Sequence, residues 1–95
     1  MHRVLRILDQ MHCEREASQD YAESSAECSD PELKQIYASL ARQEYDHHAI
    51  LEAQCNRLVD KLEAAGEIDK ECAEWIRKKN LRHAAKAKGM VESLK

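Results

Sequence analysis

A chain of 95 residues with two Gly, one Pro and no Phe has the composition of one small helical domain rather than of a sheet protein. Its four cysteines stand far apart without a Cys-x-x-Cys pair, which argues against a zinc ribbon or an iron–sulfur cluster and favours reduced thiols. The net charge is −3, and up to Ile76 seventeen Asp and Glu stand against eight Lys and Arg, an acidic balance that discourages nucleic-acid binding.

The first helix is predicted from about Arg3 to Cys28. Its opening residues interleave charged and apolar side chains and never reach the apolar run that a signal peptide or a membrane span requires. We therefore expect a cytoplasmic protein with no membrane partner. One side of this helix carries mostly apolar and small residues from Val4 onward, and Glu14 is a carboxylate on that same side.

A tight helical hairpin is predicted around Asp30. Asp30 can cap the following helix, and Pro31 suits the first helical position because that position needs no backbone donor. The second helix extends from Pro31 to about Ala65. Gly66 follows it and can adopt the left-handed conformation that closes many helices.

A third helix is predicted from about Asp69 to residue 94, with a weaker apolar stripe that Gly89 interrupts. Beyond Ile76 seven Lys and Arg stand against a single Glu, and we expect this basic run to be a solvated helix face rather than a surface for an anionic partner. The expected fold class is therefore all-α. One domain over residues 1–95 contains an antiparallel hairpin, residues 3–65, and a C-terminal helix, about residues 69–94.

The inward stripe of the second helix carries two polar residues at its middle. It steps by three and four residues through Leu33, Tyr37, Leu40, Glu44, His47, Leu51, Cys55, Leu58 and Leu62. Glu44 and His47 are therefore expected to point at the core. His48 falls beside Ala41 and Glu52 and is assigned to the flank of the helix.

The hairpin should bring Glu14 to the level of Glu44 and His47, because these residues lie about equally far from the turn. Two carboxylates and an imidazole in an apolar interior are ligands for a divalent cation. Bundles that hold two irons use one Glu from each of two helices and a Glu-x-x-His pair from each of the other two. One chain supplies half of this set. We therefore expect a two-fold dimer that forms a four-helix bundle around two iron ions, with zinc, manganese or calcium as substitutes.

Tyr21 and Glu16 are secondary candidates. Tyr21 lies two turns from Glu14 on the same side, where it either serves the site by a hydrogen bond or an electron or is a core aromatic with a polar tip. Glu16 points elsewhere, and a solvated surface position is favoured over a role in admitting metal.

Two runs carry a family resemblance: EREASQDY from Glu14 to Tyr21, and DPELKQIYASLARQEYDH from Asp30 to His47. They resemble the helical hairpin of encapsulated ferritins and of rubrerythrin-like members of the ferritin-like superfamily, over roughly residues 5–65. The resemblance implies a ferroxidase, in which Fe(II) bound between two subunits is oxidised to Fe(III) by dioxygen.

By position in that family, the metal ligands are Glu14, Glu44 and His47. Tyr21 then lies beside the ligands, and Glu16 belongs to an outer site through which metal enters. The resemblance also implies a ring of dimers, an annular decamer, that delivers iron for storage inside an encapsulin nanocompartment.

The sequence departs from that family at Cys13 and Asp20, where a carboxylate and an aromatic residue are usual. Residues 91–95 are similar to encapsulin-targeting tails except at Glu92, and a simple helix end is the preferred interpretation.

Two other functions stay open. A rubrerythrin-like peroxide reductase normally has a four-cysteine iron centre that this chain lacks, and a non-catalytic helical adaptor would hold a structural metal such as zinc at its interface.

Overall fold

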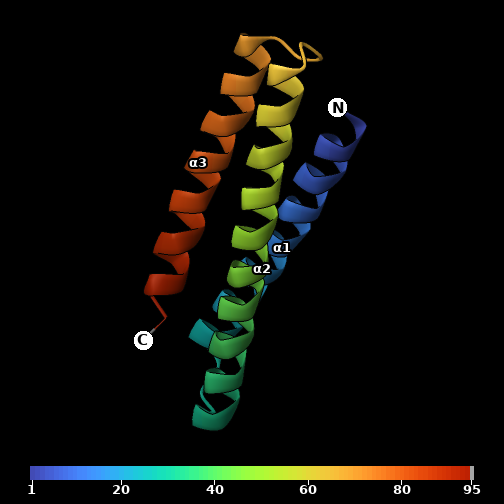
Figure 1. Ribbon diagram of the computed structural model, residues 1–95. Coiled ribbons are helices and arrows are strands. Elements are labelled where there is room, and N and C mark those ends of the chain that lie inside the picture. Colours follow the sequence, from blue (N-terminus) through green and yellow to red (C-terminus); the bar gives the residue numbers. More distant parts are fainter. Residues whose placement is uncertain (95) are drawn as a thin grey trace.

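The computed structural model describes residues 1–94, and within this range the chain forms three α-helices and no strands (Figure 1). The helices are α1 (His2–Glu27), α2 (Pro31–Ala64) and α3 (Lys70–Glu92). The all-α prediction is confirmed, and each helix begins and ends within two residues of the expected position. No helix in the described range is long and apolar enough to span a membrane.

The link between α1 and α2 is a tight turn because Asp30 caps the second helix. One carboxylate oxygen of Asp30 accepts hydrogen bonds from the backbone N–H groups of Glu32 at 3.0 Å and Leu33 at 3.3 Å. Pro31 occupies the first helical position, where a missing N–H costs nothing. The turn therefore reverses the chain within a few residues and sets α1 against α2.

A second turn leads from α2 to α3. Gly66 has a φ of 73°, a left-handed conformation that glycine adopts without steric cost. Its N–H donates to the carbonyl of Glu63 at 3.0 Å, and the next N–H, of Glu67, donates to the carbonyl of Leu62 at 2.9 Å. Asp69 then caps α3 by accepting from the Cys72 N–H at 2.7 Å. Both ends of the link are thus fixed by hydrogen bonds, and of these two ends the sequence predicted the turn at Gly66.

The molecule is a long helical hairpin with a third helix laid along part of it. In Figure 1, α3 returns along α2 and ends before it reaches the turn between α1 and α2. The Cα atoms extend over 53 × 19 × 13 Å. The core lies where the three helices meet, and its buried residues are Val4, Met11, Cys55, Val59, Ala73 and Ile76.

Only some residues of the expected inward stripe of α2 lie in the core of this chain. Leu33 is 40 % exposed and the His47 side chain 56 % exposed, whereas the buried positions of α2 are Ala38, Ala41, His48, Cys55 and Val59. The difference arises because α3 packs against the side of the hairpin that bears His48 and Cys55. The stripe that begins at Leu33 lies on the border of that contact, and its middle faces away from α3.

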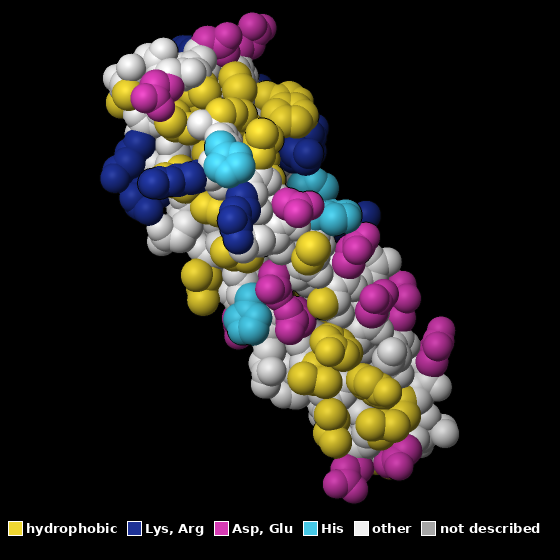
Figure 2. Space-filling view, turned by 90° about the vertical axis from the view of Figure 1, so that its right-hand side faces the viewer, with side chains coloured by type: hydrophobic (Ala, Val, Ile, Leu, Met, Phe, Trp, Pro, Cys, Tyr) yellow, Lys and Arg dark blue, Asp and Glu magenta, His cyan; other side chains and the backbone are white. Residues whose placement is uncertain are grey.

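Apolar side chains consequently remain uncovered on the hairpin. Leu33 and Ile36, just after the turn, are 40 % and 49 % exposed. Figure 2 shows apolar side chains gathered at the lower end of the visible face, with a histidine beside acidic side chains above them. We call this uncovered side of the α1–α2 hairpin, which includes Leu33, Ile36 and His47, the open face.

Candidate metal centre

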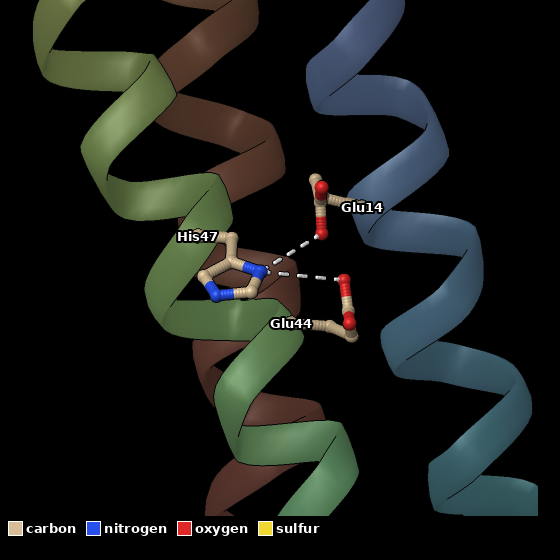
Figure 3. Close-up of side chains that lie close together, drawn as sticks. All are labelled: Glu14, Glu44 and His47. Atoms are coloured by element: carbon tan, nitrogen blue, oxygen red, sulfur yellow. Dashed lines mark ion pairs between the residues drawn. The ribbon is translucent and has the colours of Figure 1, made fainter.

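The structure brings Glu14, Glu44 and His47 together across the α1–α2 hairpin (Figure 3). One ligand atom from each residue lies within 4.8 Å of the others. The Nδ1 atom of His47 is 3.5 Å from Oε2 of Glu14 and 3.7 Å from Oε2 of Glu44. The cluster predicted from the sequence therefore exists within a single chain.

The hairpin explains why these residues meet. Glu14 precedes Asp30 by about as many residues as Glu44 and His47 follow it, and each helix rises about 1.5 Å per residue. Glu44 and His47 are three apart on α2, so their side chains emerge from neighbouring turns on one side of the helix. Both then face the α1 side chain at the same level.

The electrostatics of the cluster favour a cation. The pKa of Glu44 is raised above its usual value, first because its carboxyl hydrogen-bonds to that of Glu14, then because of burial and the Glu14 charge, while His47 opposes the rise. Oε2 of Glu14 is buried and has no hydrogen-bond partner within residues 1–94. Two carboxylates that face each other with too few donors are stabilised when a divalent cation lies between them.

The site lies on the open face. Figure 3 shows the three side chains between α1 and α2, with α3 behind the hairpin. His47 is the most exposed of them, at 56 %, compared with 27 % for Glu14 and 23 % for Glu44. Three ligand atoms fall short of the four that zinc takes and the six or more that magnesium or calcium takes. The remaining ligands have to come from water or from another chain.

The two secondary candidates lie outside the cluster. The ring of Tyr21 stacks on that of Tyr37, with a centroid distance of 6.4 Å and an angle of 26° between the planes. Glu16 is exposed and pairs with His12 on the same helix at 3.1 Å. Neither residue is among the three side chains whose ligand atoms meet.

His48 differs from the sequence-based expectation. It was assigned to the flank of α2, but it is only 1 % exposed, and its Nε2 lies 3.1 Å from Nη1 of Arg15. Burial, followed by the charges of Arg15 and His83, lowers the pKa of His48, so the imidazole is neutral and accepts the Arg15 hydrogen bond. The sequence carries a signal for this burial, since Ala41 and Cys55 lie seven residues to either side of His48.

Comparison with known proteins gives one match. A family model described as the Coat F domain matches residues 5–57, which is more than half of the chain and includes Glu14, Glu44 and His47. No curated protein and no solved structure matches the chain.

This match overturns the resemblance to encapsulated ferritins and rubrerythrin-like proteins, because no ferritin-like family model matches. The ferroxidase assignment, the peroxide reductase alternative, and iron storage in an encapsulin compartment are therefore wrong. The physical reason is that a Glu on one helix and a Glu-x-x-His on the next meet in any antiparallel hairpin with suitable spacing. The suggested targeting tail, residues 91–95, ends outside the described residues at Lys95.

Proposed function

The chain belongs to the Coat F domain family, and on that premise we propose that it is a structural component of a spore coat rather than an enzyme. The observation that carries this proposal is the family match over residues 5–57. The matched region runs from the start of α1 to beyond the middle of α2 and therefore contains most of the hairpin and the whole metal cluster.

A second copy of the chain is the partner that best fits the open face. Leu33 and Ile36 are uncovered there, and the cluster beside them has only three ligand atoms. Two hairpins related by a two-fold axis would form a four-helix bundle and bury both apolar surfaces. The pairing would also place four carboxylates and two imidazoles around a pair of divalent ions.

The metal has a structural role in this proposal. Carboxylate and imidazole together suit Fe²⁺, Zn²⁺ or Mn²⁺, whereas Ca²⁺ prefers oxygen ligands alone. An ion shared by two chains would add its binding free energy to their association. This arrangement corresponds to the non-catalytic helical adaptor with a metal at its interface. The ring of dimers came from the ferritin resemblance alone and has no support of its own.

Fractionation of spores tests the coat assignment. The tagged chain, expressed in a spore-forming host, should be recovered in the coat extract. Recovery in the fraction from the spore core would contradict the assignment.

Sedimentation equilibrium tests the pairing independently of the location in the spore. With Zn²⁺ present the chain should form a dimer, and a chelator should weaken it. Leu40→Glu, which places a charge next to Glu44 on the half-buried border of the open face, should give a monomer. Leu81→Glu is the matched control, because Leu81 is a leucine of α3 that is 69 % exposed. A wild-type chain that stays monomeric with Zn²⁺ would refute the pairing.

A further inference from the structure

A cleft lies between α1 and α3, on the opposite side of the hairpin from the metal cluster. It consists of two adjoining hollows of about 380 and 330 Å³ that share His12, Arg15 and His83 as lining residues. The first hollow continues along α3 to Lys86. The second continues the other way to Trp75. Volumes of this size are typical of sites for small molecules.

Arg15 provides a positive charge in the cleft with unused hydrogen-bond donors. Its Nη1 lies 3.1 Å from Nε2 of the neutral His48, and no carboxylate oxygen in the described chain lies within ion-pairing distance of its guanidinium. Burial lowers the pKa of Arg15. A guanidinium has five N–H donors, so a partly buried one without a carboxylate is stabilised by an anion that reaches it.

Several cationic side chains of α3 also lie near Arg15. Lys79 and Lys86 line the two hollows. The pKa of His83 is lowered first by burial and then by the charges of Arg15, Lys79, Arg82 and Lys86, because these cations lie near its imidazole. The cations therefore concentrate along the α3 wall of the cleft.

Three carboxylates oppose this positive charge. Asp9 and Glu16 lie on the α1 wall, and Glu16 is paired with His12 at 3.1 Å. Glu52 approaches Arg15 from α2, and burial raises its pKa above the usual value. None of the three forms an ion pair with Arg15, so the guanidinium keeps free donors.

The second hollow adds apolar and hydrogen-bonding surface. Leu5 and Trp75 are 56 % and 57 % exposed at its rim, and the Lys79 Nζ lies 5.0 Å from the centre of the Trp75 ring. Asn80 also lines this hollow and is 1 % exposed. Its amide nitrogen donates to Asn56, but its Oδ1 is buried without a partner within residues 1–94. This oxygen is an unused acceptor.

We propose that the cleft between α1 and α3 binds a small organic anion, with its phosphate or carboxylate group on Arg15, Lys79 and Lys86 and its apolar part against Trp75 and Leu5. Phosphate monoesters and carboxylates share the required chemistry, because both present anionic oxygens to a guanidinium. The site is separate from the metal cluster and does not depend on the proposed coat function.

Trp75 is the only tryptophan in the chain, so its single indole N–H resonance reports on the cleft. Phenyl phosphate, benzoate and inorganic phosphate are titrated into the ¹⁵N-labelled chain, with sodium chloride at matched ionic strength as the reference. We expect saturable shifts of the indole resonance with phenyl phosphate or benzoate, and weaker binding of inorganic phosphate, which lacks an apolar part. Comparison of the first two probes distinguishes a phosphate site from a carboxylate site. Shifts no larger than those with chloride would overturn the proposal.

Matched variants locate the binding. Arg15→Gln should lower the affinity for the tightest-binding probe by at least about tenfold, since it removes a charged donor pair. The double variant of Lys79→Gln and Lys86→Gln should lower this affinity by a similar factor. Both positions are exposed or half-buried and do not contribute to the core, so this variant tests the site even if Arg15→Gln fails to fold. Lys78→Gln with Lys88→Gln is the control on the same helix, because neither residue lines the cleft. Equal affinity in both double variants would overturn the assignment.

Discussion

His47 and His48 are neighbours in the sequence but serve opposite sides of the hairpin. Nδ1 of His47 lies 3.5 Å from Glu14 on the open face, whereas Nε2 of His48 lies 3.1 Å from Arg15 on the side where α3 packs. Glu14 and Arg15 are likewise consecutive on α1. α1 thus contributes Glu14 to the acidic cluster and the next residue, Arg15, to the cleft, while α2 places His47 in that cluster and the next residue, His48, against Arg15.

Removal of one carboxylate should abolish most metal binding. Glu44→Gln keeps the size of the side chain but removes a charged ligand, and we expect Zn²⁺ affinity to fall by at least about tenfold. Isothermal titration calorimetry measures the change. Glu74→Gln is the control, because Glu74 is an exposed carboxylate of α3 outside the cluster. Equal Zn²⁺ affinity in the wild type and Glu44→Gln would show that the cluster is not the binding site.

Acid should destabilise the metal-free chain through His48. Its folded-state pKa lies below 6.5, because of burial and then the charges of Arg15 and His83, whereas unfolding restores the ordinary value. As the pH falls below about 6.5, the unfolded state binds more protons, so the free energy of unfolding decreases until the folded-state pKa is passed.

Thermal melts in the presence of a chelator measure this effect. His48→Gln retains an acceptor for Arg15 but does not titrate, so its melting temperature should fall less steeply with acidity than that of the wild type. The pKa of His83 is shifted in the same direction and should leave a residual slope in the variant. Identical slopes in the two proteins would contradict the predicted role of His48.

Ile76 should be a major contributor to the attachment of α3. Its side chain is fully buried in the core cluster. Ile76→Ala should lower the free energy of unfolding by about 2–5 kcal/mol, because it removes buried methyl groups and leaves a cavity. Leu81→Ala, at a position 69 % exposed on the same helix, should change it by less than about 0.5 kcal/mol. Urea denaturation measures the free energy of unfolding of both variants. Similar losses in the two would show that Ile76 does not anchor α3 in the core.

The four thiols, all free in the structure, should differ in reactivity. Cys55 is fully buried, and burial raises its pKa, although the Asn80 amide opposes the rise. Cys13 is exposed. Iodoacetamide at about pH 8 should therefore alkylate Cys13 first and leave Cys55 protected until the chain unfolds. Peptide mass spectrometry gives the order of modification, and early labelling of Cys55 would show that the core opens readily.

The sequence was sufficient to predict the three helices and the meeting of Glu14, Glu44 and His47. Asp30 with Pro31 marked the first turn and Gly66 marked the second, because these residues supply caps or conformations that few others can. Glu14 and Glu44 were paired correctly, since antiparallel helices of known rise bring residues equally far from a turn to one level. These predictions needed only local chemistry and one geometric rule.

The faces of the hairpin could not be assigned in the same way. The apolar stripe of α2 is wide enough for two contacts, and periodicity does not say which part faces α3. His48 was therefore placed on the flank, although α3 makes its position the buried one. The cleft around Arg15 was also missed, because it depends on where Trp75 and Lys86 of α3 come to lie.

Because Glu14 and Arg15 are consecutive in α1 and point to different sides of the hairpin, an insertion beside them should disrupt both sites. Neighbouring residues of a helix point about 100° apart. One residue inserted just after Arg15, with the rest of the helix held in place, would turn the preceding segment by that angle and carry the guanidinium to the position of the Glu14 carboxylate. The cluster of Glu44 and His47 would then contain a positively charged side chain in place of the Glu14 carboxylate. Insertions are therefore expected to be tolerated in the link between Ala65 and Asp69 rather than within the hairpin helices.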